Sequence, residues 1–120
     1  MAVRAIRAAI QIDGNDREQI LAGASELVRE MLHRNDLTND DLISIVFTAT
    51  PDLNAEFPAY AARLMGMTDV PLLCSTEIAV PGAMPRVLRL LAHVETDRTR
   101  AEIAHPYLRG AAALRRDLPQ

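Results

Sequence analysis

Two arginines lie inside apolar segments that predict β-strands. Arg7 falls in residues 3–12 and Arg89 in residues 86–96. A guanidinium keeps its charge when it is sheltered from water, so each of these side chains needs an anion beside it. The pattern alone favours an ion pair with an Asp or Glu of the same chain, and the alternative is an anionic ligand.

Further polar groups follow a predicted strand in residues 74–77, with the sequence CSTE, just before a Pro-Gly break. Functional groups concentrate on such connections. Taken singly, Cys74 is more typical of a small buried residue and Tyr107 of a packing residue with a satisfied hydroxyl.

The usual catalytic motifs are missing from the sequence. It contains no phosphate-binding glycine loop, no nucleophile elbow and no paired-histidine metal motif. His33, His93 and His105 are scattered, and with one cysteine they make a poor zinc set. The residues therefore indicate an anion-binding protein without an evident nucleophile, and we expect no metal.

The order of elements predicts one α/β (α+β) domain spanning residues 1–120, with a mixed sheet and helices on one face. An Asn15–Glu18 pair has the spacing of a capping box at the first helix, and Gly66 is the stop of the second. The predicted strands are residues 3–12, 42–49, 70–74, 86–96 and 107–114, the predicted helices end near residues 34 and 66, and a helical turn falls within 97–104.

Composition excludes several classes of protein. The 120 residues are 49% hydrophobic and 24% charged, which is typical of a globular domain, and a chain this small benefits from a partner surface. The net charge is −3 and only 3% of the residues are aromatic, so we expect no nucleic-acid partner. The N-terminal segment lacks a signal-peptide pattern, no apolar run reaches the length of a membrane span, and the single cysteine fits a reducing compartment. We expect a cytoplasmic protein without a membrane partner.

Five blocks, in order, resemble the monofunctional chorismate mutases of the small trimeric α/β kind. The similarity runs from Val3 to Leu118. The blocks are VRAIRAA at the first strand, FTATPDLNAEFPAYAAR at residues 47–63, VPLLCSTEI at residues 70–78, PRVLRLLAHVETD around Arg89, and HPYLRGAAALRRDL around Tyr107.

The resemblance implies a mixed sheet whose helices lie on one side, in a homotrimer that forms a pseudo-α/β barrel with active sites at the subunit interfaces. It also implies a cofactor-free [3,3] rearrangement of chorismate to prephenate, which needs no proton transfer. Such an enzyme must hold a compact substrate conformer and stabilise the charge that grows on the ether oxygen.

Carried over by position, Arg89 would face the ether oxygen, while Arg7 and Tyr107 would hold a carboxylate. Glu77 would accept the ring hydroxyl, with Cys74 beside it as a polar contact. The remaining positions implied by the resemblance are the walls, formed by Phe57, Ala59, Leu72, Leu73 and Leu114, and the mouth, lined by Arg63 and Arg115.

The chain departs from the family pattern around this site, although no carried-over catalytic group is lost. The departures are Ala8 in place of glycine, Tyr60 in place of lysine, Thr76 and Ala79 in place of polar residues, Pro106 just before Tyr107, and Arg116 in place of proline. They leave two alternatives open: a non-catalytic trimer that binds a carboxylated metabolite, and an enzyme acting on a modified chorismate.

Overall fold

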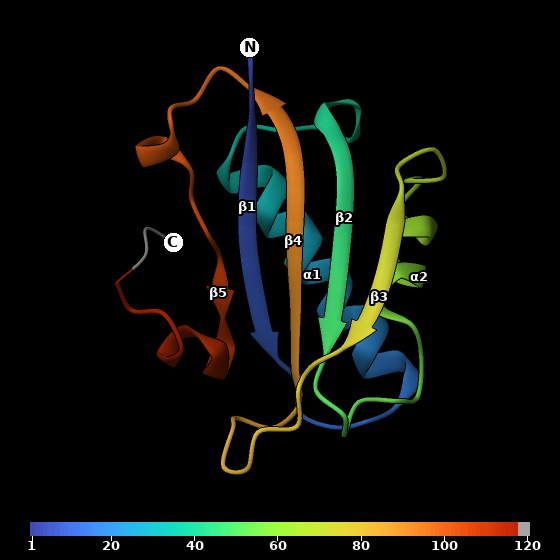
Figure 1. The fold of residues 1–120 in the computed structure, drawn as a ribbon. Coiled ribbons are helices and arrows are strands. Elements are labelled where there is room, and N and C mark those ends of the chain that lie inside the picture. The colour runs from blue at the N-terminus through green and yellow to red at the C-terminus, as the bar shows by residue number, and fades with distance from the viewer. Residues whose placement is uncertain (118–120) are drawn as a thin grey trace.

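Residues 1–117 are described by the computed structural model, and their strands form one mixed sheet (Figure 1). Its order is β3-β2-β4-β1-β5, with β4 antiparallel to both neighbours, β3 parallel to β2 and β5 parallel to β1. The predicted mixed sheet is confirmed; the end of the predicted domain, residues 118–120, lies outside the described residues. The strands are β1 (Ala2–Gln11), β2 (Leu42–Ala49), β3 (Leu72–Thr76), β4 (Val87–Thr96) and β5 (Tyr107–Leu108).

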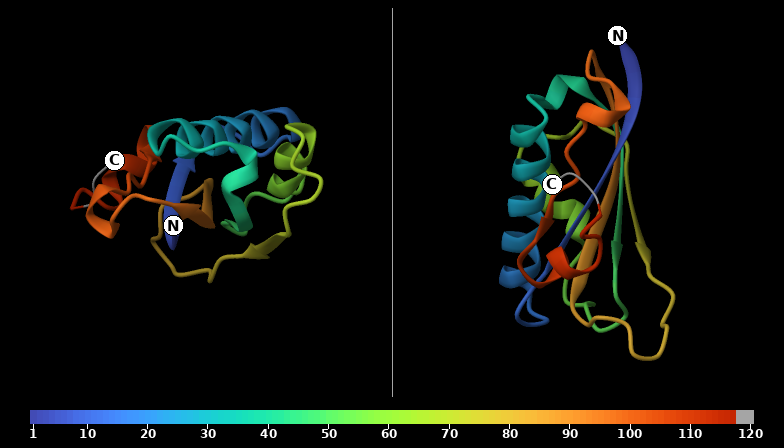
Figure 2. Two further views of the ribbon diagram at one scale, coloured as in Figure 1. Left: turned by 90° about the horizontal axis from the view of Figure 1, so that it is seen from above. Right: turned by 90° about the vertical axis from the view of Figure 1, so that its left-hand side faces the viewer.

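Both helices, α1 (Arg17–Arg34) and α2 (Pro58–Leu64), cover the same face of the sheet (Figure 2). The apolar stripe of α1 packs on alternate strand residues, and Leu27 and Phe47 are both fully buried there. Pro58 occupies the first turn of α2, where its missing N–H breaks no helical bond. Within residues 1–117, neither α-helix lies on the opposite face of the sheet, as the sequence predicted. Among the described residues, no helix combines the length and the apolar character that a membrane crossing requires.

The start of α1 differs from the prediction. Asp16 is the N-cap and accepts the Gln19 N–H at 2.9 Å, so the predicted capping box from Asn15 is wrong. The side-chain oxygen of Asn15 instead accepts the N–H groups of Asn54 and Ala55, both at 3.0 Å. Asn15 thereby fixes the loop that leads into α2.

The bounds of two strands were also predicted wrongly: β3 at both ends, since it runs from Leu72 to Thr76, and the last strand at its C-terminal end. β3 begins at Leu72 because Pro71 has no N–H, although its carbonyl still accepts from Ile45 at 3.0 Å. The last strand ends at Leu108, because Arg109 adopts a φ of 54° and starts the 3₁₀ helix Arg109–Ala113. The helical turn predicted within residues 97–104 is confirmed as the 3₁₀ helix Arg100–Glu102.

Candidate functional site

The strand register places the strand arginines on the open face of the sheet. Arg89 lies opposite Ala9 on β1 and Thr48 on β2, and Ala9 in turn lies opposite Tyr107 on β5. Side chains in such a row project from one side of the sheet, one strand spacing apart. Arg7 belongs to the neighbouring row, two residues before Ala9, so Arg7, Arg89 and Tyr107 share one region.

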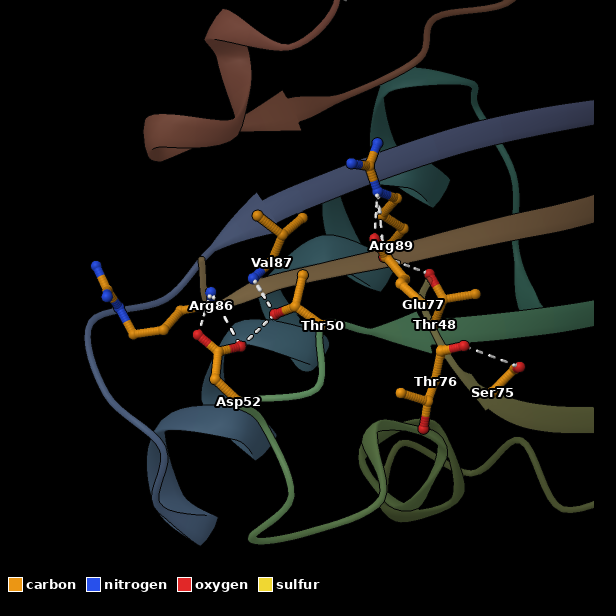
Figure 3. A network of polar contacts seen from close by, with 9 residues as sticks. All are labelled: Thr48, Thr50, Asp52, Ser75, Thr76, Glu77, Arg86, Val87 and Arg89. Atoms are coloured by element: carbon orange, nitrogen blue, oxygen red, sulfur yellow. Dashed lines mark hydrogen bonds and ion pairs between the residues drawn. The ribbon is translucent and has the colours of Figure 1, made fainter. Parts of the chain in front are cut away.

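Arg89 forms the ion pair that its pattern favoured, and its partner is Glu77. The Arg89 Nε donates to the two Glu77 carboxylate oxygens at 3.2 and 3.1 Å (Figure 3). The Thr48 hydroxyl donates to Glu77 Oε2 at 2.7 Å. Only Nε of the guanidinium is engaged within residues 1–117, and the terminal amino groups point away from Glu77. They remain available to a ligand anion.

Arg7 is different, because its exposed guanidinium makes no ion pair within the part of the chain that the structure describes. Its backbone N–H donates to Nδ1 of His105 at 3.1 Å. Desolvation lowers the pKa of His105, and the charge of Arg7 lowers it further. The ring is therefore kept neutral and able to accept this bond, which holds β1 beside the segment that precedes β5.

Tyr107 is 5% exposed and belongs to a small apolar cluster on the open face. Leu114 packs on the same cluster. The 3₁₀ helix after β5 therefore brings Leu114, a predicted wall residue, close to Tyr107, which is predicted to bind a carboxylate. Arg115 follows and donates to both oxygens of Asp117, at 3.0 and 2.9 Å. This pairing lowers the pKa of Asp117 to about 2.

A second group of predicted site residues lies at the other edge of the sheet, between β3 and α2. It forms a cavity of about 340 Å³. Phe57 and Leu73 are its most exposed apolar members, at 71% and 69%. The predicted residues in this lining are Phe57, Ala59, Arg63, Leu72, Leu73 and Cys74, and Glu56 and Tyr60 complete it.

Cys74 and Glu77, which the resemblance places side by side at the ligand, have different partners within the chain. Cys74 is paired in register with Phe47, a core residue on the helix-covered side, whereas Glu77 binds Arg89 on the open side. Burial raises the pKa of the Cys74 thiol. The thiol thus belongs with the group around Phe57 rather than with the Arg89 group.

The predicted site residues therefore fall into two groups within a single chain. The first, here called the arginine half, contains Arg7, Glu77, Arg89, Tyr107, Leu114 and Arg115; the second, the wall half, contains the six predicted residues between β3 and α2. Tyr107 on β5 and Leu72 on β3 stand at opposite edges of the sheet, four strand spacings or roughly 19 Å apart, while Glu77 follows β3 and binds Arg89 on β4. One small molecule cannot touch both edges of the same chain.

A network of polar contacts fixes the end of β2 against the start of β4 (Figure 3). Val87 N–H donates to the Thr50 hydroxyl at 3.0 Å, and Asp52 accepts the Arg86 N–H at 3.0 Å. Arg86 has a φ of 54°, a left-handed conformation that costs about 1 kcal/mol and that these contacts maintain. The TPD part of the block at residues 47–63 thereby sets the register of Arg89.

Two residues that contact the arginine half, Thr48 and His105, were not predicted from the sequence. Thr48 could have been found from its alternation with Ser44, since residues four apart on a strand share a face. For His105 the sequence gives no signal, because its contact with Arg7 depends on the path of the chain before β5. Within residues 1–117, no three His, Cys, Asp or Glu side chains are grouped in a way that could hold a metal ion.

Comparison with known proteins gives a consistent result. The family model described as chorismate mutase type I matches residues 3–118. A chorismate mutase AroH from Thermus thermophilus is 44% identical over 117 residues, which is 97% of this chain and 96% of the relative. The chorismate mutase AroH of Bacillus subtilis (strain 168) is 35% identical over 119 residues, or 98% and 94% of the two chains. A solved chorismate mutase from Clostridium thermocellum has 45% identity and a TM-score of 0.90, covering 92% of this chain and 98% of its own.

Proposed function

Because this chain belongs to the chorismate mutase type I family, we propose that it converts chorismate to prephenate in sites completed by two subunits of a homotrimer. The observation that carries the proposal is the Arg89 guanidinium. Its Nε is held by Glu77 while its terminal amino groups face the open side of the sheet.

The reaction itself is a [3,3] rearrangement within one molecule. The ether carbon–oxygen bond breaks as a new carbon–carbon bond forms, so atoms and electrons balance without a proton donor, a covalent intermediate or a cofactor. Negative charge develops on the ether oxygen along the way. A donor that meets this charge stabilises the transition state more than the bound substrate, and it therefore raises kcat.

In this proposal the arginine half performs the chemistry. Arg89 directs its amino groups at the ether oxygen and one carboxylate, and Glu77 accepts the ring hydroxyl. Arg7 and Tyr107 bind the other carboxylate, which suits a guanidinium that makes no ion pair within residues 1–117. Leu114 lies against the substrate beside Tyr107, and Arg115 lies at the mouth.

The wall half comes from the neighbouring subunit. Phe57, Ala59, Leu72 and Leu73 enclose the substrate and favour its folded conformer, with Cys74 as a polar contact and Arg63 at the mouth. Exposed apolar residues support this assembly. Val3 and Leu91 on the open face are exposed, as are Phe57 and Leu73, and exposed apolar surface of this kind is typical of an interface. A second copy would bury them and bring the two half-sites together. We also propose a cytoplasmic location, which the single cysteine supports.

The direct test is the loss of the near-ultraviolet absorbance of chorismate on adding purified protein, with prephenate identified as the product. Arg89→Ala should lower kcat by about 10²–10³-fold, as removal of an oxyanion donor does elsewhere. Light scattering should give the mass of a trimer. Chorismate that binds but does not react would point to a metabolite-binding trimer or to a modified substrate, and a fully active monomer would contradict the shared sites.

A further inference from the structure

We propose that Thr48 is a positioning residue for this reaction: its hydroxyl orients the Glu77 carboxylate, which in turn holds the Arg89 guanidinium toward the substrate. The inference rests on the proposed function, because it assigns Arg89 and Glu77 the roles given above.

The contact of Thr48 with Glu77 has the character of a strong hydrogen bond. A hydroxyl has one proton to donate, and that of Thr48 goes to Oε2 at 2.7 Å, a length typical of a bond to a charged carboxylate. Thr48 is β-branched and lies on β2, which is paired on both sides by β3 and β4. The donor is therefore held by the sheet rather than by a mobile loop.

Without this bond, Glu77 would be poorly fixed. It follows the end of β3, an edge strand whose side chains are mostly exposed. Its N–H donates to the Ala49 carbonyl at 2.9 Å, which fixes the backbone but leaves the side-chain torsions free. Only Arg89 would then restrain the carboxylate, and a pair of long, partly exposed side chains does not hold one geometry by itself.

The cross-strand register makes Thr48 the residue able to supply this restraint. It lies directly opposite Arg89 on β4, so Glu77 is bound from two adjacent strands of the same row. Among the described residues, Glu77 Oε1 accepts only the longer bond from Arg89, at 3.2 Å, and keeps a lone pair for the substrate hydroxyl. Loss of the Thr48 hydroxyl would alter the aim of the guanidinium without removing any group that contacts substrate.

Such a loss should affect the rate more than binding. Displacements of about 1 Å at a catalytic group are enough to reduce rates strongly. Thr48→Val is nearly isosteric and lacks the donor, so kcat should fall about tenfold with KM changed by less than about twofold. Thr48→Ser, which keeps the hydroxyl, should recover most of the wild-type kcat. Ser44→Ala is the matched control: Ser44 lies on the same strand and face, but its hydroxyl contacts His93 at 3.3 Å.

A double-mutant cycle tests whether Thr48 acts through Glu77. Thr48→Val should change kcat little in a Glu77→Ala background, because the group it orients is already gone. Additive losses, or equal losses in Thr48→Val and Ser44→Ala, would overturn the inference. Inactive wild-type protein would instead refute the proposed function.

A crystal structure of Thr48→Val decides the positioning role independently of turnover. We expect the Glu77 carboxylate to rotate and the Arg89–Glu77 geometry to change. An unchanged pair of side chains would refute the role of Thr48 whatever the enzyme proves to catalyse.

Discussion

The proposal that each active site takes its two halves from different chains predicts that two inactive variants restore activity when their subunits are mixed. Arg89→Ala removes the central cation of the arginine half. Phe57→Asp places a negative charge in the wall half, facing a dianionic substrate. Phe57 is the N-cap of α2 and has no side-chain cap bond, so aspartate, a favoured N-cap residue, should leave that helix intact.

The size of the recovery follows from the separation of the half-sites. In an equimolar random mixture, about one half of the interfaces have an arginine half from a Phe57→Asp chain, in which that half is intact. About one half of these interfaces have a wall half from an Arg89→Ala chain, in which the wall half is intact. About one quarter of the sites, and so about one quarter of wild-type activity, should therefore be recovered. If each site lay within one chain, no activity would return. Subunits would be randomised by co-expression or by joint refolding, and chorismate turnover would be measured per trimer.

A second mixture provides the control. Wild-type chains are mixed in equal amount with chains that carry both substitutions. If the sites lie between chains, about one quarter of them should be active; if each site lies within one chain, about one half should be active. Light scattering must show trimers in every sample. Activity near zero in the first mixture together with about one half in the second would refute shared sites.

Three further predictions concern single residues. Arg89→Lys keeps a cation but loses the fork that binds Glu77 and the substrate together, so kcat should fall roughly tenfold or more, and a kcat equal to that of wild type would contradict the role of the guanidinium. Burial and the charge of Arg7 lower the pKa of His105. The neutral His105 ring therefore contributes to stability at pH values above the ordinary histidine pKa, and this contribution is lost as the pH falls below about 6.5. Thermal unfolding at pH 7.5 and pH 5 should therefore show a larger acid-induced loss in wild type than in His105→Asn, and equal losses would refute the argument. Burial raises the pKa of Cys74, so alkylation by iodoacetamide should be slow at neutral pH and accelerate only above the range of an ordinary thiol; rapid labelling at pH 7 would contradict this.

The elements that pack the core were predictable because their patterns are strong. The apolar run at residues 42–49 is rich in β-branched residues and the stripe of α1 recurs at helical spacing, so the strand and the helix could be predicted, and the order of elements indicated the open face. The boundaries that failed depend on backbone details. A positive φ at Arg109, a non-glycine residue, ends β5 six residues sooner than the apolar pattern suggests, and Asp16 rather than Asn15 provides the cap.

The candidate site was predictable only in part. An arginine inside an apolar strand shows that an anion is needed, but the sequence cannot say which one. The structure gives Arg89 an internal partner, Glu77, and gives Arg7 none among the described residues. The division into two half-sites depends on the strand order, with β3 and β5 at opposite edges of the sheet. The hydrophobic periodicity of the sequence does not predict that order.

The proposed chemistry explains why a sheet with so few specialised groups is sufficient. A rearrangement without proton transfer does not require a base of adjusted pKa or an activated nucleophile; it requires a fixed cation and a shaped enclosure. A guanidinium stays charged at any working pH, so the remaining problem is its orientation. The central strands solve that problem, since Arg89 on β4 is held by Glu77 and Glu77 by Thr48 on β2. The enclosure needs only apolar surface, which the neighbouring subunit's edge strand and α2 can provide, and this division allows a chain of 120 residues to build a complete site.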